Sequence, residues 1–182
     1  MKRLIIISLV LLVTLGTGML GISCTCGEEV AEPPPTPPSI PGEGIYLTPP
    51  FVDAQPGQQL SIKIEVKPSG WGVSGGEINL AFNPGALQAV SIEPGDFLGS
   101  SPIVGLKRVD NQAGVIRLAL ARVGKTQVPS PPGVLATVDF KILGSATSGT
   151  YEIKLTKVGL ADESFQDITD FTIQGASIKI SS

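Results

Sequence analysis

Strict alternation of aliphatic and polar residues runs through Leu60-Ser61-Ile62-Lys63-Ile64-Glu65-Val66-Lys67. In an extended chain successive side chains point to opposite sides, so the four aliphatic residues share one side and the four polar residues share the other. A helix would scatter the same residues around its axis, because its repeat is 3.6 residues. The octapeptide therefore predicts a β-strand with one buried side and one solvent-exposed side.

The same period-two pattern recurs along the chain from residue 44 onward. It is clearest at Ile78-Asn79-Leu80-Ala81-Phe82, at Tyr151-Glu152-Ile153-Lys154-Leu155 and at Ile178-Lys179-Ile180. Further strands are predicted at 45–48, 87–92, 103–109, 115–122, 134–143 and 171–174, separated by turns such as Glu93-Pro94-Gly95-Asp96. Nine or ten short strands with one apolar side each can bury those sides only as two packed sheets or a barrel. We expect an all-β sandwich over residues 44–182.

Composition excludes several classes of function. The chain of 182 residues contains no His, which removes Ser–His and Cys–His nucleophile systems and His-liganded metal sites. With only two Cys in addition, a zinc site is not expected. The net charge of −3 offers no bulk attraction for nucleic acid. The sequence indicates no cofactor.

Residues 1–23 have the layout of an export signal. Lys2 and Arg3 precede an apolar run from Leu4 to Leu15, which is shorter than the roughly 20 residues of a membrane-spanning helix. The alternative is a retained N-terminal helical anchor, since the apolar stretch can be extended to Ile22.

The segment Leu20-Gly21-Ile22-Ser23-Cys24 resembles the lipobox of bacterial lipoproteins, although Gly21 stands where that motif prefers Leu. The resemblance implies that Cys24 is acylated and becomes the mature N-terminus. Two acyl chains would anchor the protein stably without a membrane span. A disulfide between Cys24 and Cys26 would close a very tight ring and is geometrically poor.

Residues 24–43 form an acidic, proline-rich linker. The run Pro33-Pro34-Pro35-Thr36-Pro37-Pro38 favours the extended polyproline II conformation and cannot bury a core. A stiff stalk of this kind holds a domain away from a surface. A proline-rich ligand for another protein is the less favoured reading. We expect the protein at the cell surface or outside the cell, attached to a membrane only through a lipid anchor or the signal segment.

Three segments of the predicted sandwich form a recognisable series. They are Gly75-Gly76-Glu77-Ile78-Asn79-Leu80-Ala81-Phe82-Asn83-Pro84-Gly85-Ala86-Leu87, Val90-Ser91-Ile92-Glu93-Pro94-Gly95-Asp96-Phe97-Leu98 and Gly133-Val134-Leu135-Ala136-Thr137-Val138-Asp139-Phe140-Lys141-Ile142. In this order they resemble the cohesin domain family. A departure is Phe82-Asn83, which replaces the usual Tyr-Asp. The resemblance implies a flattened jelly-roll sandwich of nine strands. It also implies a non-catalytic docking module that binds dockerin-type domains of other secreted proteins, often in polysaccharide catabolism.

In the cohesin family one outer sheet face is the docking surface. The strands that match it here are 77–82, 103–109, 115–122 and 151–157, and alternation places small and charged side chains on their outward side. The candidates for the partner-binding face are Glu77, Asn79, Ala81, Arg117, Ala119, Ala121 and Arg122. Flat surfaces of small side chains suit a protein partner better than a small molecule. The alternative is that these alanines have no binding role.

A second class of function is carbohydrate binding by the same type of sandwich. Trp71, between Gly70 and Gly72, could stack its indole ring on a sugar. The alternative for Trp71 is a hydrophobic lid over one end of the sandwich. This alternative is favoured because nine aromatic residues in the whole chain can hardly form an aromatic strip for a polysaccharide. A polysaccharide is therefore the second candidate partner.

Enzymatic activity is not expected. Paired carboxylates, such as Glu77 or Asp139 with Asp110 or Asp162, are the only remaining catalytic route, and nothing in their spacing predicts a cleft. The acidic segment Asp162-Glu163-Ser164-Phe165-Gln166-Asp167 lacks the glycine and terminal glutamate of a calcium loop, so it is interpreted as a solvated turn.

Overall fold

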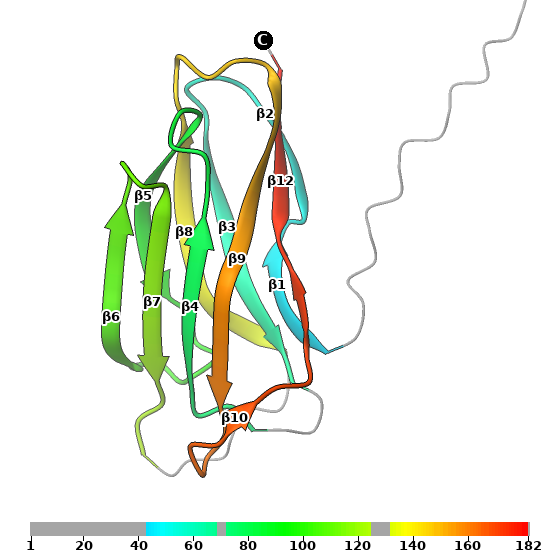
Figure 1. Cartoon of the computed structure of the whole chain (residues 1–182). Coiled ribbons are helices and arrows are strands. Elements are labelled where there is room, and N and C mark those ends of the chain that lie inside the picture. The colour runs from blue at the N-terminus through cyan, green and yellow to red at the C-terminus, as the bar shows by residue number, and fades with distance from the viewer. Residues whose placement is uncertain (1–42, 69–71, 125–131, 182) are drawn as a thin grey trace, which may run out of the picture. The chain divides into compact units, whose positions relative to one another are not determined.

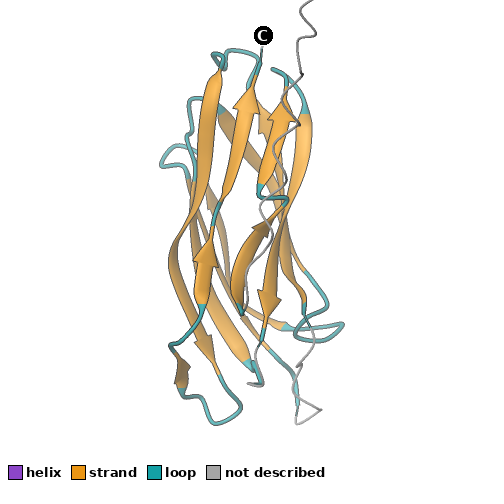
Figure 2. Cartoon of the chain, turned by 90° about the vertical axis from the view of Figure 1, so that its right-hand side faces the viewer, coloured by secondary structure: helices purple, strands orange, loops and turns teal. Residues whose placement is uncertain are grey.

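The computed structural model describes residues 43–68, 72–124 and 132–181. Within these residues the chain forms twelve β-strands and no helix (Figures 1 and 2). The strands are β1 (Gly44–Thr48), β2 (Phe51–Ala54), β3 (Gln59–Lys67), β4 (Gly75–Ala81), β5 (Leu87–Pro94), β6 (Ile103–Asp110), β7 (Val115–Ala121), β8 (Gly133–Ile142), β9 (Gly149–Ala161), β10 (Asp167–Ile168), β11 (Thr172–Gln174) and β12 (Ala176–Ile180). The all-β prediction is confirmed.

The strands form two sheets that pack face to face. One sheet has the order β11-β1-β3-β8-β5, and the other has the order β2-β12-β9-β4-β7-β6, with the short β10 paired to β9. Neighbouring strands are antiparallel except for the pairs β1–β11 and β12–β2, which are parallel. Figure 1 shows β4, β7, β6 and β9 side by side in the second sheet, in front of β3, β5 and β8 of the first. The two-sheet sandwich predicted from the sequence is the observed architecture.

The core lies between the two sheets and is apolar throughout. The alternation in β3 is reproduced, because Ile62, Ile64 and Val66 are fully buried while Ser61 and Lys63 are exposed. Phe140 of β8 meets Phe82 edge to face, with ring centroids 5.3 Å apart. No polar or charged side chain of the described residues is fully buried. Hydrophobic burial and close packing therefore hold the sheets together.

Two short strands, β2 and β10, were not predicted. With them the structure has twelve strands, compared with the nine or ten expected from the sequence. Phe51–Ala54 directly follows Pro49 and Pro50 and pairs in parallel with β12 at the edge of the sheet. Asp167–Ile168 pairs only with the end of β9. Neither segment is long enough to show a period-two pattern of its own, so only pairing with a distant strand makes it extended.

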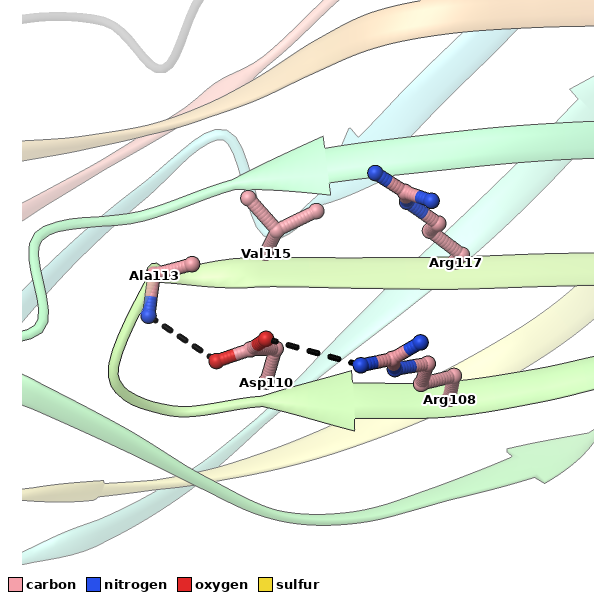
Figure 3. A pocket seen from close by; sticks show the side chains of 5 residues that line it. All are labelled: Arg108, Asp110, Ala113, Val115 and Arg117. Carbon is pink, nitrogen blue, oxygen red and sulfur yellow. Dashed lines mark hydrogen bonds and ion pairs between the residues drawn. The ribbon is translucent and has the colours of Figure 1, made fainter.

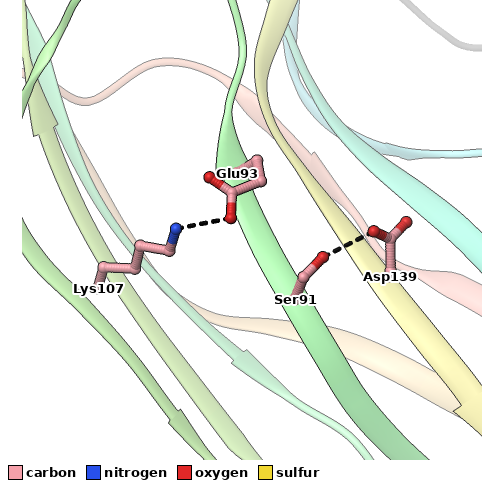
Figure 4. Close-up of polar contacts among 4 residues, drawn as sticks. All are labelled: Ser91, Glu93, Lys107 and Asp139. Atoms are coloured by element: carbon pink, nitrogen blue, oxygen red, sulfur yellow. Dashed lines mark hydrogen bonds and ion pairs between the residues drawn. The ribbon is translucent and has the colours of Figure 1, made fainter.

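An ion pair links the two sheets along their β5 and β6 edges. Lys107 of β6 donates from Nζ to Oε1 of Glu93 of β5 at 2.8 Å (Figure 4). Both side chains are largely exposed to solvent, so this contact contributes at most about 1 kcal/mol to stability.

Among the described residues, no helix is long and apolar enough to cross a membrane.

Candidate functional site

Four neighbouring strands, β9, β4, β7 and β6, form one continuous outward surface, which we call the β4–β7 face. Its rows, read from β9 to β4 to β7, are Gly159–Glu77–Ala119, Lys157–Asn79–Arg117 and Lys154–Ala81–Val115. Six of the seven predicted face residues therefore lie on two adjacent strands, in directly paired positions. The predicted grouping of these side chains is observed.

The burial pattern shows which side of β7 faces outward. Ile116, Leu118 and Leu120 are at most 4% exposed and point into the core. Arg117 is exposed, whereas Ala119 and Ala121 are half-buried on the same outward side. Beyond Arg117, the outward side of β7 therefore carries only small side chains.

Arg122, the seventh predicted residue, lies directly after the end of β7. Its backbone N–H donates to the carbonyl oxygen of Ser74 at 2.8 Å, which continues the β4–β7 pairing by one residue. The side chain is half-buried beside the turn that follows β9. Arg122 is therefore at the margin of the face, not at its centre.

Charged side chains on β9 are neutralised within the sheet. Lys157 Nζ donates to Glu77 Oε2 at 2.8 Å, which links the predicted residue Glu77 to β9. Lys154 forms a similar pair with Glu152 at 2.7 Å. These groups are substantially exposed, so the pairs orient side chains more than they stabilise the fold.

One end of the β4–β7 face is apolar, and sequence reasoning did not identify its most prominent residue. A shallow hollow of about 320 Å³ lies over Gly75, Ala119 and Ala121, with Phe165 at its edge. The Phe165 side chain is 82% exposed, far more than is usual for a phenylalanine. Ile103 of β6, paired with Ala121, adds a second exposed apolar side chain at this end. We call this region the apolar end.

Phe165 is presented by the turn that the sequence indicated as solvated. Asp162 Oδ1 accepts hydrogen bonds from the backbone N–H groups of Ser164 and Gln166, at 2.7 and 2.9 Å, and closes the turn. Phe165 has φ of 61°, the left-handed region that bulky residues rarely adopt. The turn is solvent-exposed as predicted, but it also holds an aromatic ring at the apolar end.

The other end of the face carries two arginines, and we call it the cationic end. Arg108 of β6 lies directly opposite Arg117 of β7. Together with Asp110, Ala113 and Val115 they line a hollow of about 110 Å³ (Figure 3). Arg108 was not among the predicted residues, because a bulge between Val104 and Leu106 changes which residues of β6 point outward.

On the outer face of the opposite sheet, one carboxylate is held by two hydroxyl groups. Asp139 of β8 accepts a hydrogen bond from the hydroxyl group of Ser61 at 2.5 Å. It accepts a second one from the hydroxyl group of Ser91 at 2.6 Å (Figure 4). The hydrogen bonds from Ser61 and then Ser91 lower the pKa of the Asp139 carboxyl. Asp139 is thus an ionised structural group on this sheet.

Two further predicted residues, Trp71 and Cys24, lie outside the described residues. The sugar contact assigned to Trp71 and the lipidation assigned to Cys24 remain predictions. In the described part of the chain, no group of three or more His, Cys, Asp or Glu residues could hold a metal ion.

The chain matches the model of a known protein family. The family model of the cohesin domain matches residues 45–180, which is most of the chain. The chain belongs to the cohesin family. The matched range begins with β1 and ends with β12, so the family model covers both sheets of the sandwich.

Solved cohesin structures share the fold at low sequence identity. A type II cohesin domain from the cellulosome of Acetivibrio cellulolyticus is 21% identical with a TM-score of 0.66, over 76% of this chain and 95% of that one. A chain of a type I cohesin–dockerin complex from Clostridium thermocellum is 15% identical with a TM-score of 0.64, over 76% and 98%.

A non-cellulosomal cohesin from the archaeon Archaeoglobus fulgidus is 15% identical with a TM-score of 0.60, over 76% of this chain and 91% of that one. At these identities the likeness establishes the fold. No curated protein matches the chain in sequence.

Proposed function

We propose that this cohesin is a non-catalytic docking module that binds a dockerin-type domain of another secreted protein on its β4–β7 face. The observation that carries the proposal is the shallow hollow over the small residues Gly75, Ala119 and Ala121, beside the exposed ring of Phe165. An aromatic side chain at the edge of a flat surface of small residues is typical of protein–protein binding sites. Family membership supports the same role, because related cohesins have been solved in complex with dockerins.

We further propose that the protein works outside the cell, in the breakdown of polysaccharides. The support is the export-type segment 1–23, the linker 24–43 and the candidate acylation site Cys24. In this arrangement the stalk holds the sandwich away from the membrane and the docked partner supplies the catalytic activity.

Capture of dockerin domains tests the docking proposal. The full chain is immobilised and presented with a panel of dockerin domains in the presence of calcium. Ala119→Arg places a long charged side chain in the shallow hollow of the face and should reduce capture at least tenfold. Thr137→Arg is the matched control, because Thr137 points outward from β8 on the opposite sheet.

Equal capture of the Ala119→Arg variant and the wild-type protein would contradict docking at this face. Binding to glycans that is abolished by Trp71→Ala, without dockerin capture, would instead favour the carbohydrate-binding function. Incorporation of a palmitate analogue into the wild-type protein but not into Cys24→Ser is the expected result for a lipid anchor. Label that persists in Cys24→Ser would refute that anchor.

A further inference from the structure

The cationic end of the β4–β7 face combines two like charges in a position where strands rarely carry them. Arg108 and Arg117 occupy directly opposed positions on the antiparallel strands β6 and β7. Like charges opposed across a strand pair are destabilising, because the charged groups are held within several ångströms of each other. The repulsion between the two guanidinium groups is reduced when an anion lies between them.

The acidic side chains of the described residues compensate little of the positive charge of these two arginines. Asp110 Oδ2 is 3.9 Å from Arg108 Nη2, at the limit of an ion pair. The other oxygen of Asp110 accepts a hydrogen bond from the backbone N–H of Ala113 at 3.0 Å, which commits it to the hairpin turn. The Arg117 guanidinium group has no ion pair or hydrogen bond with any residue of the described chain.

Neighbouring lysines do not share this property. Lys157 and Lys154 each have a carboxylate partner at 2.7–2.8 Å, Glu77 and Glu152 respectively. The uncompensated positive charge of the face is therefore concentrated at Arg117 and Arg108, although the whole chain carries a net charge of −3. The local charge differs in sign from that of the molecule.

Space for a small anionic group is present beside these arginines. Arg108, Asp110, Ala113, Val115 and Arg117 surround the hollow of about 110 Å³, and Figure 3 shows both arginine side chains along one side of the sheet. A guanidinium group presents parallel N–H donors that match the two oxygens of a carboxylate. The hollow can therefore receive the end of an aspartate or glutamate side chain.

The cationic end and the apolar end are separated by a fixed length of sheet. Arg117 pairs with Asn79, and Ala121 pairs with Gly75, four residues earlier on β4. Four residues of strand correspond to about 14 Å. A partner helix lying along the face would span this distance with about nine residues.

From this arrangement we infer that the partner places a carboxylate between Arg108 and Arg117, about 14 Å along the sheet from an apolar group that lies over Ala121. The inference rests on the proposed docking function and specifies the chemistry of the partner. Charge complementarity at the cationic end then selects partners with an acidic side chain at that spacing and disfavours partners with a basic one.

Two experiments test the carboxylate site separately from docking. In the first, dissociation constants of a captured dockerin domain are measured for the wild-type full chain, Arg108→Gln, Arg117→Gln and the double variant Lys63→Gln/Lys141→Gln. Each arginine variant should bind about tenfold more weakly and depend less on salt. The lysine variant removes two charges from the outer face of the opposite sheet and should bind like the wild-type protein. Unchanged binding of both arginine variants would overturn the inference and leave the docking proposal intact.

The second experiment needs no dockerin. The guanidinium NMR signals of the full chain, kept in solution with a non-ionic detergent, are followed during titration with N-acetyl-aspartate amide and, separately, with the neutral asparagine analogue at matched ionic strength. Saturable shifts of Arg108 and Arg117 with the aspartate compound alone support the carboxylate site, even if no dockerin is captured and the docking proposal fails. Equal responses to both compounds, or none, would overturn the inference.

Discussion

Single side chains on the two outer faces differ in whether they interact with other residues of the fold. On the β4–β7 face, Phe165 is exposed and the Arg117 guanidinium group has no partner within the described chain, so both are available to another molecule. On the opposite face, Asp139 is held by two serine hydroxyl groups and its hydrogen-bonding capacity is used within the fold. This contrast supports the proposal that the partner binds the β4–β7 face, and it gives Asp139 a stabilising role.

Replacing Asp139 by Asn should destabilise the domain in a pH-dependent way. The lowered pKa of Asp139 means that the folded state favours the ionised carboxylate, so its contribution is complete above the ordinary aspartate pKa of about 4. We expect Asp139→Asn to lower the free energy of unfolding by about 1 kcal/mol at pH 7. As pH falls through the lowered pKa, the difference between the two proteins should shrink.

Urea denaturation of both proteins at pH 7 and near pH 3 measures this effect. Asp53→Asn, on the short edge strand β2, is the control for loss of a carboxylate without two hydroxyl donors. A difference that stays constant, or grows, as the solution is acidified would contradict the assigned role of Asp139.

Replacing Phe165 by Asn should separate binding from stability. Asn tolerates the left-handed conformation that Phe165 adopts, and the Phe165 ring contributes little to the core because it is 82% exposed. Thermal unfolding should therefore show an unchanged stability or a gain of up to about 1 kcal/mol. Dockerin capture should weaken at least tenfold, as is usual for an aromatic contact residue. A variant that unfolds more easily would indicate a structural role for Phe165, and a variant that binds normally would contradict its role in docking.

The sequence predicted some of these residues and not others for a physical reason. Arg117, Ala119 and Ala121 could be placed on the outward side because β7 keeps strict alternation. Arg108 could not, because the bulge in β6 puts both Ile103 and Leu106 opposite outward residues of β7 although they are three positions apart. Phe165 could not, because its exposure depends on where a turn between β9 and β10 lies against the sheet.

At the scale of elements, pairing partners rather than local sequence decide the less regular parts. The long strands, such as β3 and β8, were recognisable from their own alternation because each has one side in the core. Strand β2 has too few residues for such a signal and exists through its parallel pairing with β12. The sheet that carries the binding face could be named in advance only through resemblance to the cohesin family, since alternation does not reveal which strands are neighbours.

The hairpin between β6 and β7 depends on one glycine, and it positions both Arg108 and Arg117. Gly114 has φ of 65°, and a Cβ atom at this position would lie only 2.2 Å from the carbonyl oxygen of Phe82. Gly114→Ala should therefore lower the free energy of unfolding by more than about 2 kcal/mol. Chemical denaturation gives this value directly.

Gly57 supplies the matched control for that experiment. It also has a positive φ, of 85°, but a Cβ atom there would meet nothing within 4 Å. Gly57→Ala should consequently lose only about 1 kcal/mol, the cost of the backbone conformation itself. If the two variants were equally destabilised, the close approach of Phe82 to the hairpin would have no energetic importance.

At the scale of the whole molecule, the residues that stabilise the sandwich are different from those of the proposed binding face. The core between the sheets is closed and apolar, and one sheet presents the β4–β7 face with an apolar end and a cationic end about 14 Å apart. The sandwich architecture followed from periodicity, while the position of the two ends required the register of four strands. Binding at this face would leave the core unchanged.

The most direct test of this account is cross-saturation NMR on a complex of the methyl-labelled full chain with a protonated dockerin domain. Saturation of the partner's protons should reduce the methyl signals of Ala119, Ala121 and Ile103 on the β4–β7 face. The exposed methyl groups of Val90, on strand β5 of the opposite sheet, should keep their intensity. Loss of signal at Val90, with Ala119 and Ala121 unaffected, would contradict the central claim.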